Sequence, residues 1–426
     1  MTDRKTALQA TLQAAIEARQ QELYDLLSSL IRVDSQNFGS SGREENIAPL
    51  ISDLMRGLGM EPDIYSPMDV PGLAQNPDYW DGHHLENRYN VTGHVPGTGK
   101  RRLMLAAHSD TVAIGNPESW TVDPLSGEQK DGKIWGRGAC DDKYGIAAAL
   151  FLIRLLRDLG ITLPYDLYFT AYCDEECGGS NGALASCLKY PCDDIANLDC
   201  KNLQIWAVAA GGGELKAFIR SEKPLDSCGV MMDGLMILRE EFLRLKERRV
   251  AELSQVPLYR DTVIPQTSVR FLEFRTGNGS SDLDRGQVQL VFYTTLDKAA
   301  FDRELDELAA RADARLRPLG LRFDRFERPT RHFIFNQTRL SDNPALDALI
   351  RAGAESVGET LAPCGSCLSD LSIFLKYGSP RAFSFGAGRD FDEYGGAHQA
   401  NEFIECESFL NFTKILGAFL LEYEAQ

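Results

Sequence analysis

The sequence of 426 residues contains no apolar run long enough to cross a membrane. Its longest such stretch, residues 146–153, ends at Arg154, whereas a transmembrane helix needs about 20 apolar residues. The N-terminal segment is charged and shows neither the apolar core nor the small-residue cleavage site of a secretory signal. These absences predict a cytoplasmic protein without a membrane partner.

Positive charge is also scarce, since 45 Lys and Arg residues stand against 62 Asp and Glu residues, for a net charge of −17. Such an acidic chain is a poor partner for nucleic acid or an anionic membrane. Apolar residues make up 43% and charged residues 25% of the chain, which are ordinary values for a globular protein and exclude disorder or a coiled coil. The length predicts two or three domains.

Closely spaced cysteine pairs are nearly absent, although the chain has 10 cysteines. Scattered cysteines in a large chain indicate reduced, mostly buried thiols, as expected in the cytoplasm. Cys364 and Cys367 form a lone Cys-x-x-Cys motif, and without a second pair it is weak support for a zinc or redox site.

Short apolar strands alternate with helices in the first half of the chain. Residues 103–107 are uninterruptedly apolar, which is typical of a strand buried on both faces of a sheet. The alternation predicts an α/β catalytic domain with a mostly parallel sheet and helices on both faces. The expected elements are helices over 5–32, 44–58 and 145–159, and strands over 90–93, 103–107 and 165–172.

The pattern changes after about residue 210 and returns near residue 343. Glycines 211–213 predict a hinge or tight turn. Long charged helices and strands then alternate irregularly, which predicts a smaller α+β domain inserted in the first. The expected domains are 1–209, 210–335 and 336–426. The elements expected here are helices over 229–248, 297–315, 343–357, 370–377 and 407–424, and strands over 267–275, 287–295 and 381–385.

Chemically active side chains gather after the predicted strands and before one helix. The four groups are His108-Ser109-Asp110, the Asp141-Asp142 pair that opens the helix, Asp174-Glu175-Glu176, and the segment 396–402 around His398. Each has a plainer interpretation: a packed histidine, helix capping by aspartate, or solvated charge on a loop. Ligands, however, usually bind at the carboxyl ends of the strands in an open α/β sheet.

Imidazole and carboxylate groups together are the ligands of zinc and related divalent metals. A carboxylate shared between two ions would give a two-metal hydrolytic centre, with the ions about 3.5–4 Å apart.

The four groups, in this order, resemble the co-catalytic zinc amidohydrolase and exopeptidase family that includes acetylornithine deacetylase, succinyl-diaminopimelate desuccinylase, glutamate carboxypeptidase and the aminoacylases. The resemblance extends from about Leu23 to the C-terminus and is weak only in the inserted domain. It implies that Asp141 bridges two divalent ions, zinc or else cobalt or manganese, and that Glu176 and His398 complete one site.

The resemblance also implies that His108 and a further carboxylate complete the other metal site. Asp199 fits the family spacing best, with Asp193 and Asp194 as alternatives and Cys200 beside it. Asp110 would orient His108, and Glu175 would act as the general base. The family often has a cis peptide after its bridging aspartate, which corresponds to Asp141–Asp142.

The inserted domain departs from the family pattern. The His-Ser-x-x-Pro segment, whose histidine reaches the active site of the other subunit, is not evident, and Tyr293 stands where an arginine often holds a substrate carboxylate. Arg275 and Asn278, in a glycine-containing segment, are candidate substrate contacts, and the plainer interpretation is an ordinary loop between two strands with a solvated arginine. The resemblance implies a homodimer formed through this domain, with a monomer as the alternative.

These observations predict a metal-dependent amidohydrolase or deacylase acting on a small-molecule amide such as an N-acyl or N-carbamoyl amino acid. Glu175 would activate a water shared by the metals. A dipeptidase or carboxypeptidase is the alternative, and a catalytically inactive binding protein of the same fold is the remaining one.

Overall fold

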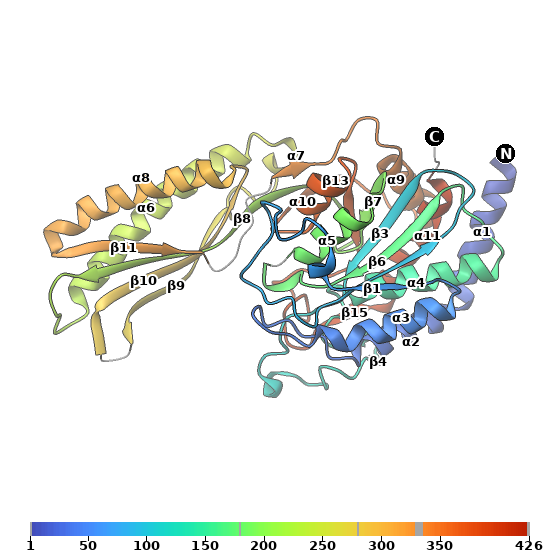
Figure 1. Cartoon of the computed structure of the whole chain (residues 1–426), viewed down its shortest axis with the longest axis horizontal. Helices are drawn as coiled ribbons and strands as arrows, with labels where there is room; N and C mark the ends of the chain where they lie inside the picture. Colours follow the sequence, from blue (N-terminus) through green and yellow to red (C-terminus); the bar gives the residue numbers. More distant parts are fainter. Residues whose placement is uncertain (1, 179, 279–280, 329–334, 424–426) are drawn as a thin grey trace. The chain divides into compact units, whose positions relative to one another are not determined.

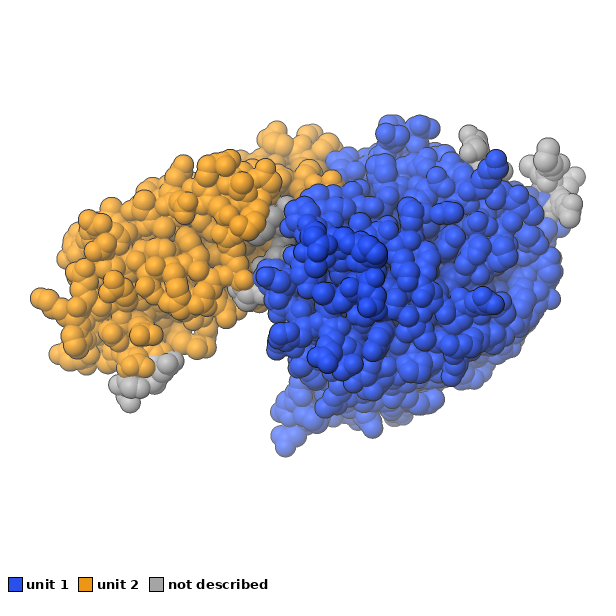
Figure 2. All heavy atoms as spheres, in the orientation of Figure 1, with its two compact units in different colours: residues 1–207, 337–364, 373–426 blue, residues 208–336, 365–372 orange. Residues whose placement is uncertain are grey.

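The structure is a computed structural model that describes residues 2–178, 180–278, 281–328 and 335–423. The chain forms two compact units (Figure 2). Unit 1 comprises Met1–Ala207, Gln337–Cys364 and Ile373–Gln426, and unit 2 comprises Val208–Asn336 and Gly365–Ser372. The short segment 365–372 therefore packs with unit 2, although the chain around it belongs to unit 1.

Unit 1 is built on a mixed sheet with strand order β1-β2-β6-β3-β7-β14-β8. Of these strands, β1, β6, β3, β7 and β8 are labelled in Figure 1. The four central strands β6, β3, β7 and β14 run parallel, and β2 and β8 flank them antiparallel. This arrangement confirms the predicted mostly parallel α/β sheet. The strands are β1 (Asp63–Tyr65), β2 (Asn90–Val95), β3 (Arg102–His108), β6 (Asp166–Tyr172), β7 (Asp194–Asn197), β8 (Gln204–Ser221) and β14 (Phe383–Gly386).

Both faces of this sheet are covered because its central strands are apolar on both sides. Leu103 and Leu105 of β3 belong to the large core that also holds the almost entirely buried helix α4 (Lys143–Asp158). On β6, the ring of Tyr172 packs edge-on against Phe374, with centroids 5.6 Å apart. The remaining helices of unit 1 are α1 (Thr2–Ala18), α2 (Gln20–Ile31), α3 (Ile47–Gly57), α5 (Asn181–Lys189), α9 (Pro344–Ser356) and α11 (Cys406–Glu422). The short helix α10 (Leu371–Ile373) begins in unit 2 and ends in unit 1.

Short elements complete unit 1. A second, separate sheet has three strands, which are β15 (Phe403–Glu405), β5 (Lys133–Trp135) and β4 (Glu128–Lys130). Single helical turns cover η1 (Glu44–Asn46), η2 (Pro67–Asp69), η3 (Pro117–Ser119) and η4 (Glu176–Gly178), and η6 (Phe374–Gly378) is a π-helical turn.

Unit 2 is an α+β unit in which two long helices pack on one face of an antiparallel sheet. Apolar residues that alternate along β8 pack against both helices, and the rings of Phe292 and Phe301 stack 4.2 Å apart. The elements are the distal part of β8, β9 (Val269–Asn278), β10 (Ser281–Thr294), β11 (Leu321–Glu327), α6 (Gly229–Leu253), α7 (Pro257–Arg260), α8 (Lys298–Leu316) and η5 (Arg317–Leu319), with β12 (Asn336–Gln337) and β13 (Pro363–Cys367) near the unit boundary.

Two local predictions were wrong. The helix expected over 5–32 is two helices, α1 and α2, which meet at Arg19. The glycines 211–213 form no turn but lie in the middle of the 18-residue strand β8. A Cβ on Gly212 would come within 2.0 Å of the carbonyl oxygen of Phe292 on the paired strand. Glycine is therefore needed there because the two strands approach closely, and not because the chain reverses direction.

All 10 cysteines are free thiols. Among the described residues, no helix combines the length and the apolar character needed to cross a bilayer.

Candidate metal centre

The site lies where the parallel strands of unit 1 end. His108 is the last residue of β3, Glu175 and Glu176 follow β6, Asp199 follows β7, and His398 lies in the loop after β14. These are four adjacent strands of one sheet, so their carboxyl ends meet at one edge. The remaining potential ligand, Asp141, lies just before the first turn of α4.

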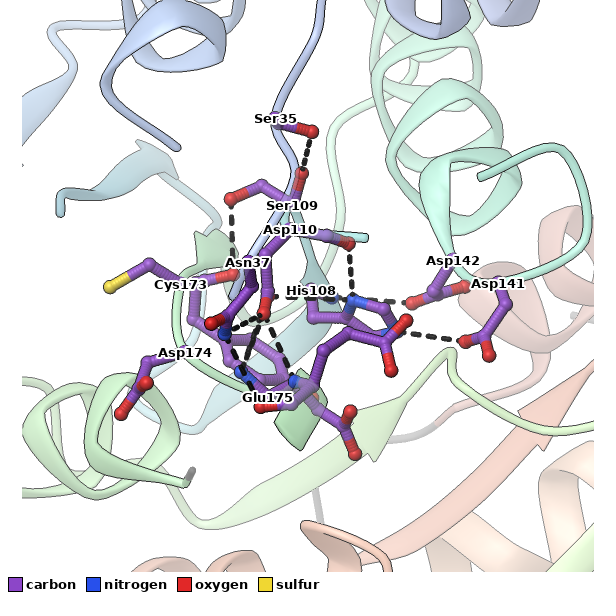
Figure 3. A network of polar contacts seen from close by, with 12 residues as sticks. Ser35, Asn37, His108, Ser109, Asp110, Asp141, Asp142, Cys173, Asp174 and Glu175 are labelled. Carbon is purple, nitrogen blue, oxygen red and sulfur yellow. Dashed lines mark hydrogen bonds and ion pairs between the residues drawn. The ribbon is translucent and has the colours of Figure 1, made fainter. Parts of the chain in front are cut away.

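The first group of potential ligands consists of His108, Asp141 and Asp199, whose ligand atoms all lie within 4.8 Å of one another. The Nε2 atom of His108 is 2.9 Å from Oδ1 of Asp141 (Figure 3). Burial of the imidazole is complete, so its orientation is fixed by packing.

The second group consists of Asp141, Glu176 and His398, again within 4.8 Å. The Nε2 atom of His398 lies 2.9 Å from Oε2 of Glu176 and 3.3 Å from Oδ2 of Asp141. Asp141 thus directs one carboxylate oxygen to each group. The peptide bond between Asp141 and Asp142 is cis.

The electrostatics of the site indicate that it holds an excess of buried negative charge. Burial and the neighbouring charge of Asp141 raise the pKa of Asp199 to about 7. The pKa of His398 is raised to about 11, because Glu176 and Asp141 outweigh the opposing effect of burial. A cation between these carboxylates would relieve the same crowding. The donor set of three carboxylates and two imidazoles therefore fits divalent metal ions.

Asp110 is placed to hold the loop of Glu175 and Glu176. Its carboxylate accepts hydrogen bonds from the backbone N–H groups of Glu175 and Glu176 and from the side-chain amide of Asn37, at 2.9–3.2 Å (Figure 3). Although burial opposes it, these bonds and His108 lower the pKa of Asp110. The Nδ1 atom of His108 lies closer to the main-chain oxygen of Asp110, at 3.0 Å, than to its carboxylate, at 3.6 Å.

A buried network of charged residues lies behind this loop, and it was not predicted from the sequence. Arg88 lies 2.7 Å from Glu44 and 2.8 Å from Asp174, and His83 lies 2.6 Å from the same Asp174 oxygen. Asp174 has a φ of 64°, a left-handed conformation that costs energy for a residue other than glycine. These contacts, together with the hydrogen bond from Asn181, fix the backbone one residue before Glu175. The only sequence signal was the charge of each residue, which did not reveal the pairing.

A second buried ion pair joins the loops of Asp141 and His398. Arg137 lies 2.6 Å from Glu402, and the other Glu402 oxygen accepts a hydrogen bond of 2.9 Å from the backbone N–H of Cys140. The sequence pointed to the Asp141-Asp142 pair and to the segment 396–402, but it predicted no partner for Arg137 or Glu402. Glu402 therefore ties the segment just before Asp141 to the loop of His398, although the two are far apart in sequence.

The proposed substrate residues lie in unit 2, whereas every potential metal ligand lies in unit 1. Arg275 is on β9, donates hydrogen bonds of 2.6 and 3.0 Å to Glu273, and lines a hollow of about 510 Å³ with Arg220 and Arg285. The side chain of Asn278 lies outside the described residues. Arg270 donates a hydrogen bond of 2.6 Å to the hydroxyl of Tyr293.

The chain thus combines an α/β unit with two groups of potential metal ligands that share one carboxylate. This combination is typical of the metallohydrolase class. The chain belongs to peptidase family M20/M25/M40, whose family model matches residues 104–422.

Similar proteins share this fold and parts of the sequence. The uncharacterized protein YgeY of Escherichia coli K12 is 40% identical over 101 residues, 24% of this chain and 25% of the relative. The N-formyl-4-amino-5-aminomethyl-2-methylpyrimidine deformylase of Bacillus subtilis is 29% identical over 199 residues, 46% of this chain and 42% of the relative. The chain thus matches less than half the length of these curated relatives.

Among solved structures, the di-peptidase Dug1p of Saccharomyces cerevisiae superposes with a TM-score of 0.72 at 15% identity, over 97% of this chain and 98% of that one. At this level of identity the likeness supports the fold alone.

Proposed function

We propose that this chain is a dinuclear metal-dependent hydrolase that cleaves the amide bond of a small N-acyl or N-carbamoyl amino acid. The observation that carries the proposal is that Asp141 presents one oxygen to each of two ligand groups. Shared carboxylates of this kind belong to two-metal hydrolytic centres. Membership of the peptidase family supports hydrolysis as the reaction class.

The ligand assignment follows the two groups. Asp141 would bridge two divalent ions, Glu176 and His398 would complete one site, and His108 and Asp199 the other. Zinc fits this set, and cobalt or manganese would also do so. Bound ions would polarise the scissile carbonyl and lower the pKa of a water molecule.

Glu175 is the proposed general base. Its backbone N–H donates to both oxygens of Asp110, and its side chain is only partly buried beside the ligands. Glu176 contacts His398 and accepts a hydrogen bond from the backbone N–H of Val112, so the proposed ligand role falls to Glu176 and the base role to Glu175. It would accept the proton of the attacking water and donate it to the leaving amine. Asp110 would position both glutamates.

The substrate class rests on weaker support. The name of the Bacillus subtilis relative, a deformylase, describes cleavage of a non-peptide amide, which favours a deacylase over a dipeptidase or carboxypeptidase. We retain Arg275 and Asn278 as proposed contacts for the substrate carboxylate, and their alanine variants should raise KM at constant metal content. Free thiols throughout the chain fit a cytoplasmic location.

The test begins with protein purified without chelator. Metal analysis should find two divalent ions per chain, and the protein should hydrolyse members of a panel of N-acetyl, N-formyl and N-carbamoyl amino acids faster than dipeptides. Dialysis against a chelator should abolish activity, and zinc, cobalt or manganese should restore it. Full activity in a verified metal-free sample would overturn the proposal, and faster cleavage of dipeptides would make the chain a peptidase.

Paired variants test the division of labour between the two glutamates. Glu175→Gln should lower kcat by at least ~100-fold while both ions stay bound, since general acid–base catalysis contributes about that factor or more. Glu176→Gln should instead weaken metal binding. Equal loss of metal in both variants would contradict the assignment. Glu61→Gln, at an exposed position, is the control for the effects of substitution and purification.

A further inference from the structure

An apolar ring lies half-exposed beside the candidate metal centre. The side chain of Phe391 is 52% exposed, and its ring packs edge-on against the imidazole of His398, with centroids 4.8 Å apart and an interplanar angle of 65°. The other side chains of the centre are carboxylates and imidazoles. An exposed aromatic ring at such a place presents an apolar surface to whatever binds the centre.

The loop that carries Phe391 is tied down on both sides of this residue. Asp390 forms an ion pair with Lys201, and Arg389 lies 2.7 Å from Glu405 and 3.1 Å from Glu393.

The turns of the same loop are equally constrained. The side-chain amide of Gln399 donates to the carbonyl of Phe391 itself, and the backbone N–H of Gly396 donates to Glu393 at 3.0 Å. A Cβ on Gly396 would meet the carbonyl oxygen of Asp390 at 1.8 Å, so the turn requires glycine. The exposure of Phe391 is therefore imposed by a pinned loop.

We infer that Phe391 is a specificity residue whose ring receives a hydrocarbon group of the substrate next to the scissile bond. The ring contacts His398, which is a proposed metal ligand. A group bound against the ring would therefore lie next to the residue that holds the metal at the reacting carbonyl. Covering the ring removes apolar surface from water on both partners, and each buried methylene contributes ~0.8 kcal/mol, equivalent to about fourfold in kcat/KM.

This inference rests on the proposed function and narrows its substrate class to amides that carry an apolar group. Two parts of an N-acyl amino acid could supply that group, the acyl chain and the amino-acid side chain. The chemistry at Phe391 is the same for both, and the substrate series below distinguishes them.

The experiment measures kcat/KM along two series. One lengthens the acyl chain from acetyl to hexanoyl on a fixed amino acid, and the other lengthens the side chain from alanine to norleucine under a fixed acetyl group. In the wild type, one series should rise by about two- to fourfold per methylene. In Phe391→Ala that rise should flatten to less than about 1.5-fold, and Phe391→Leu should keep part of it, with both ions still bound.

Tyr394→Ala is the matched control, because Tyr394 is a 66% exposed aromatic residue of the same loop. It should leave the rise unchanged. Equal flattening in Phe391→Ala and Tyr394→Ala would attribute the effect to the loop and overturn the assignment to the ring. A wild type that hydrolyses acetyl amino acids but shows no rise in either series would overturn this inference alone, whereas absence of any amide hydrolysis would overturn the proposed function.

Discussion

Replacing Arg88 with methionine should destabilise unit 1 by about 3–5 kcal/mol, the cost of removing one partner of a buried ion pair. The Arg88 side chain is 2% exposed, and those of Glu44 and Asp174 are fully buried. Methionine has a similar length but no charge, so it would remove the guanidinium from between the Glu44 and Asp174 carboxylates and leave only His83 and Asn181 beside Asp174. It would also remove donors to the carbonyls of Gly39 and Ser41.

Burial, not distance, sets this magnitude, and the chain offers a matched comparison. Arg56 and Asp53 also lie 2.7 Å apart, but their side chains are 56% and 73% exposed. Exposed pairs of this kind contribute about 0–1 kcal/mol. Arg56→Met should therefore be nearly neutral although it removes a contact of the same length as that between Arg88 and Glu44.

The assay is unfolding followed by tryptophan fluorescence, since all 4 tryptophans lie in unit 1. At about 2–4 °C per kcal/mol, Arg88→Met should lower Tm on the order of 10 °C. Adding Glu44→Gln to that variant should restore part of the loss, because one unpaired anion is then removed. If Arg88→Met lost no more stability than Arg56→Met, the reasoning from burial would be refuted.

Further predictions concern pH, metal content and assembly. Burial, and then the charges of Asp110 and Asp174, raise the pKa of Glu44 in the folded state above its ordinary value of 4.5, so the wild type should lose stability relative to Glu44→Gln as pH rises above about 4.5; unfolding at pH 5 and pH 8 measures this, and a constant difference would contradict it. Asp199→Ala should deplete one metal ion by elemental analysis whereas Cys200→Ser should leave both, and the reverse result would shift the ligand by one position. We also expect a homodimer formed through the edge strand β9 of unit 2, which light scattering should report as twice the 47.3 kDa of one chain; a mass near that of one chain would refute it.

Much of unit 1 was predictable because its signals are local. The apolar run 103–107 needs no partner to show that it is buried on both faces, and it forms β3 within the parallel part of the sheet. Polar residues that directly follow such strands had to meet at one edge, because parallel strands end on the same side. This reasoning, with the family resemblance, led to His108, Asp141, Glu176, Asp199 and His398, which the structure brings into two groups.

Local signals failed where a distant segment decides the conformation. Glycines 211–213 have the composition of a turn, but the close approach of β10 holds them in a long strand. The near-helical spacing of apolar residues over 5–32 continues past Arg19, whereas the helix is interrupted there and forms α1 and α2.

Sequence by itself thus determined which residue types could carry the chemistry and at which strand ends they stand, because strand burial and side-chain chemistry are properties of short segments. Only the tertiary structure decided what holds them in place. Arg88, Glu44 and Asp174 are paired across more than 40 residues of chain at each contact, and Glu402 reaches Arg137 across 265 residues. Such pairs leave no periodic pattern in the sequence, since their energy depends on burial and on distances that exist only once the chain has folded.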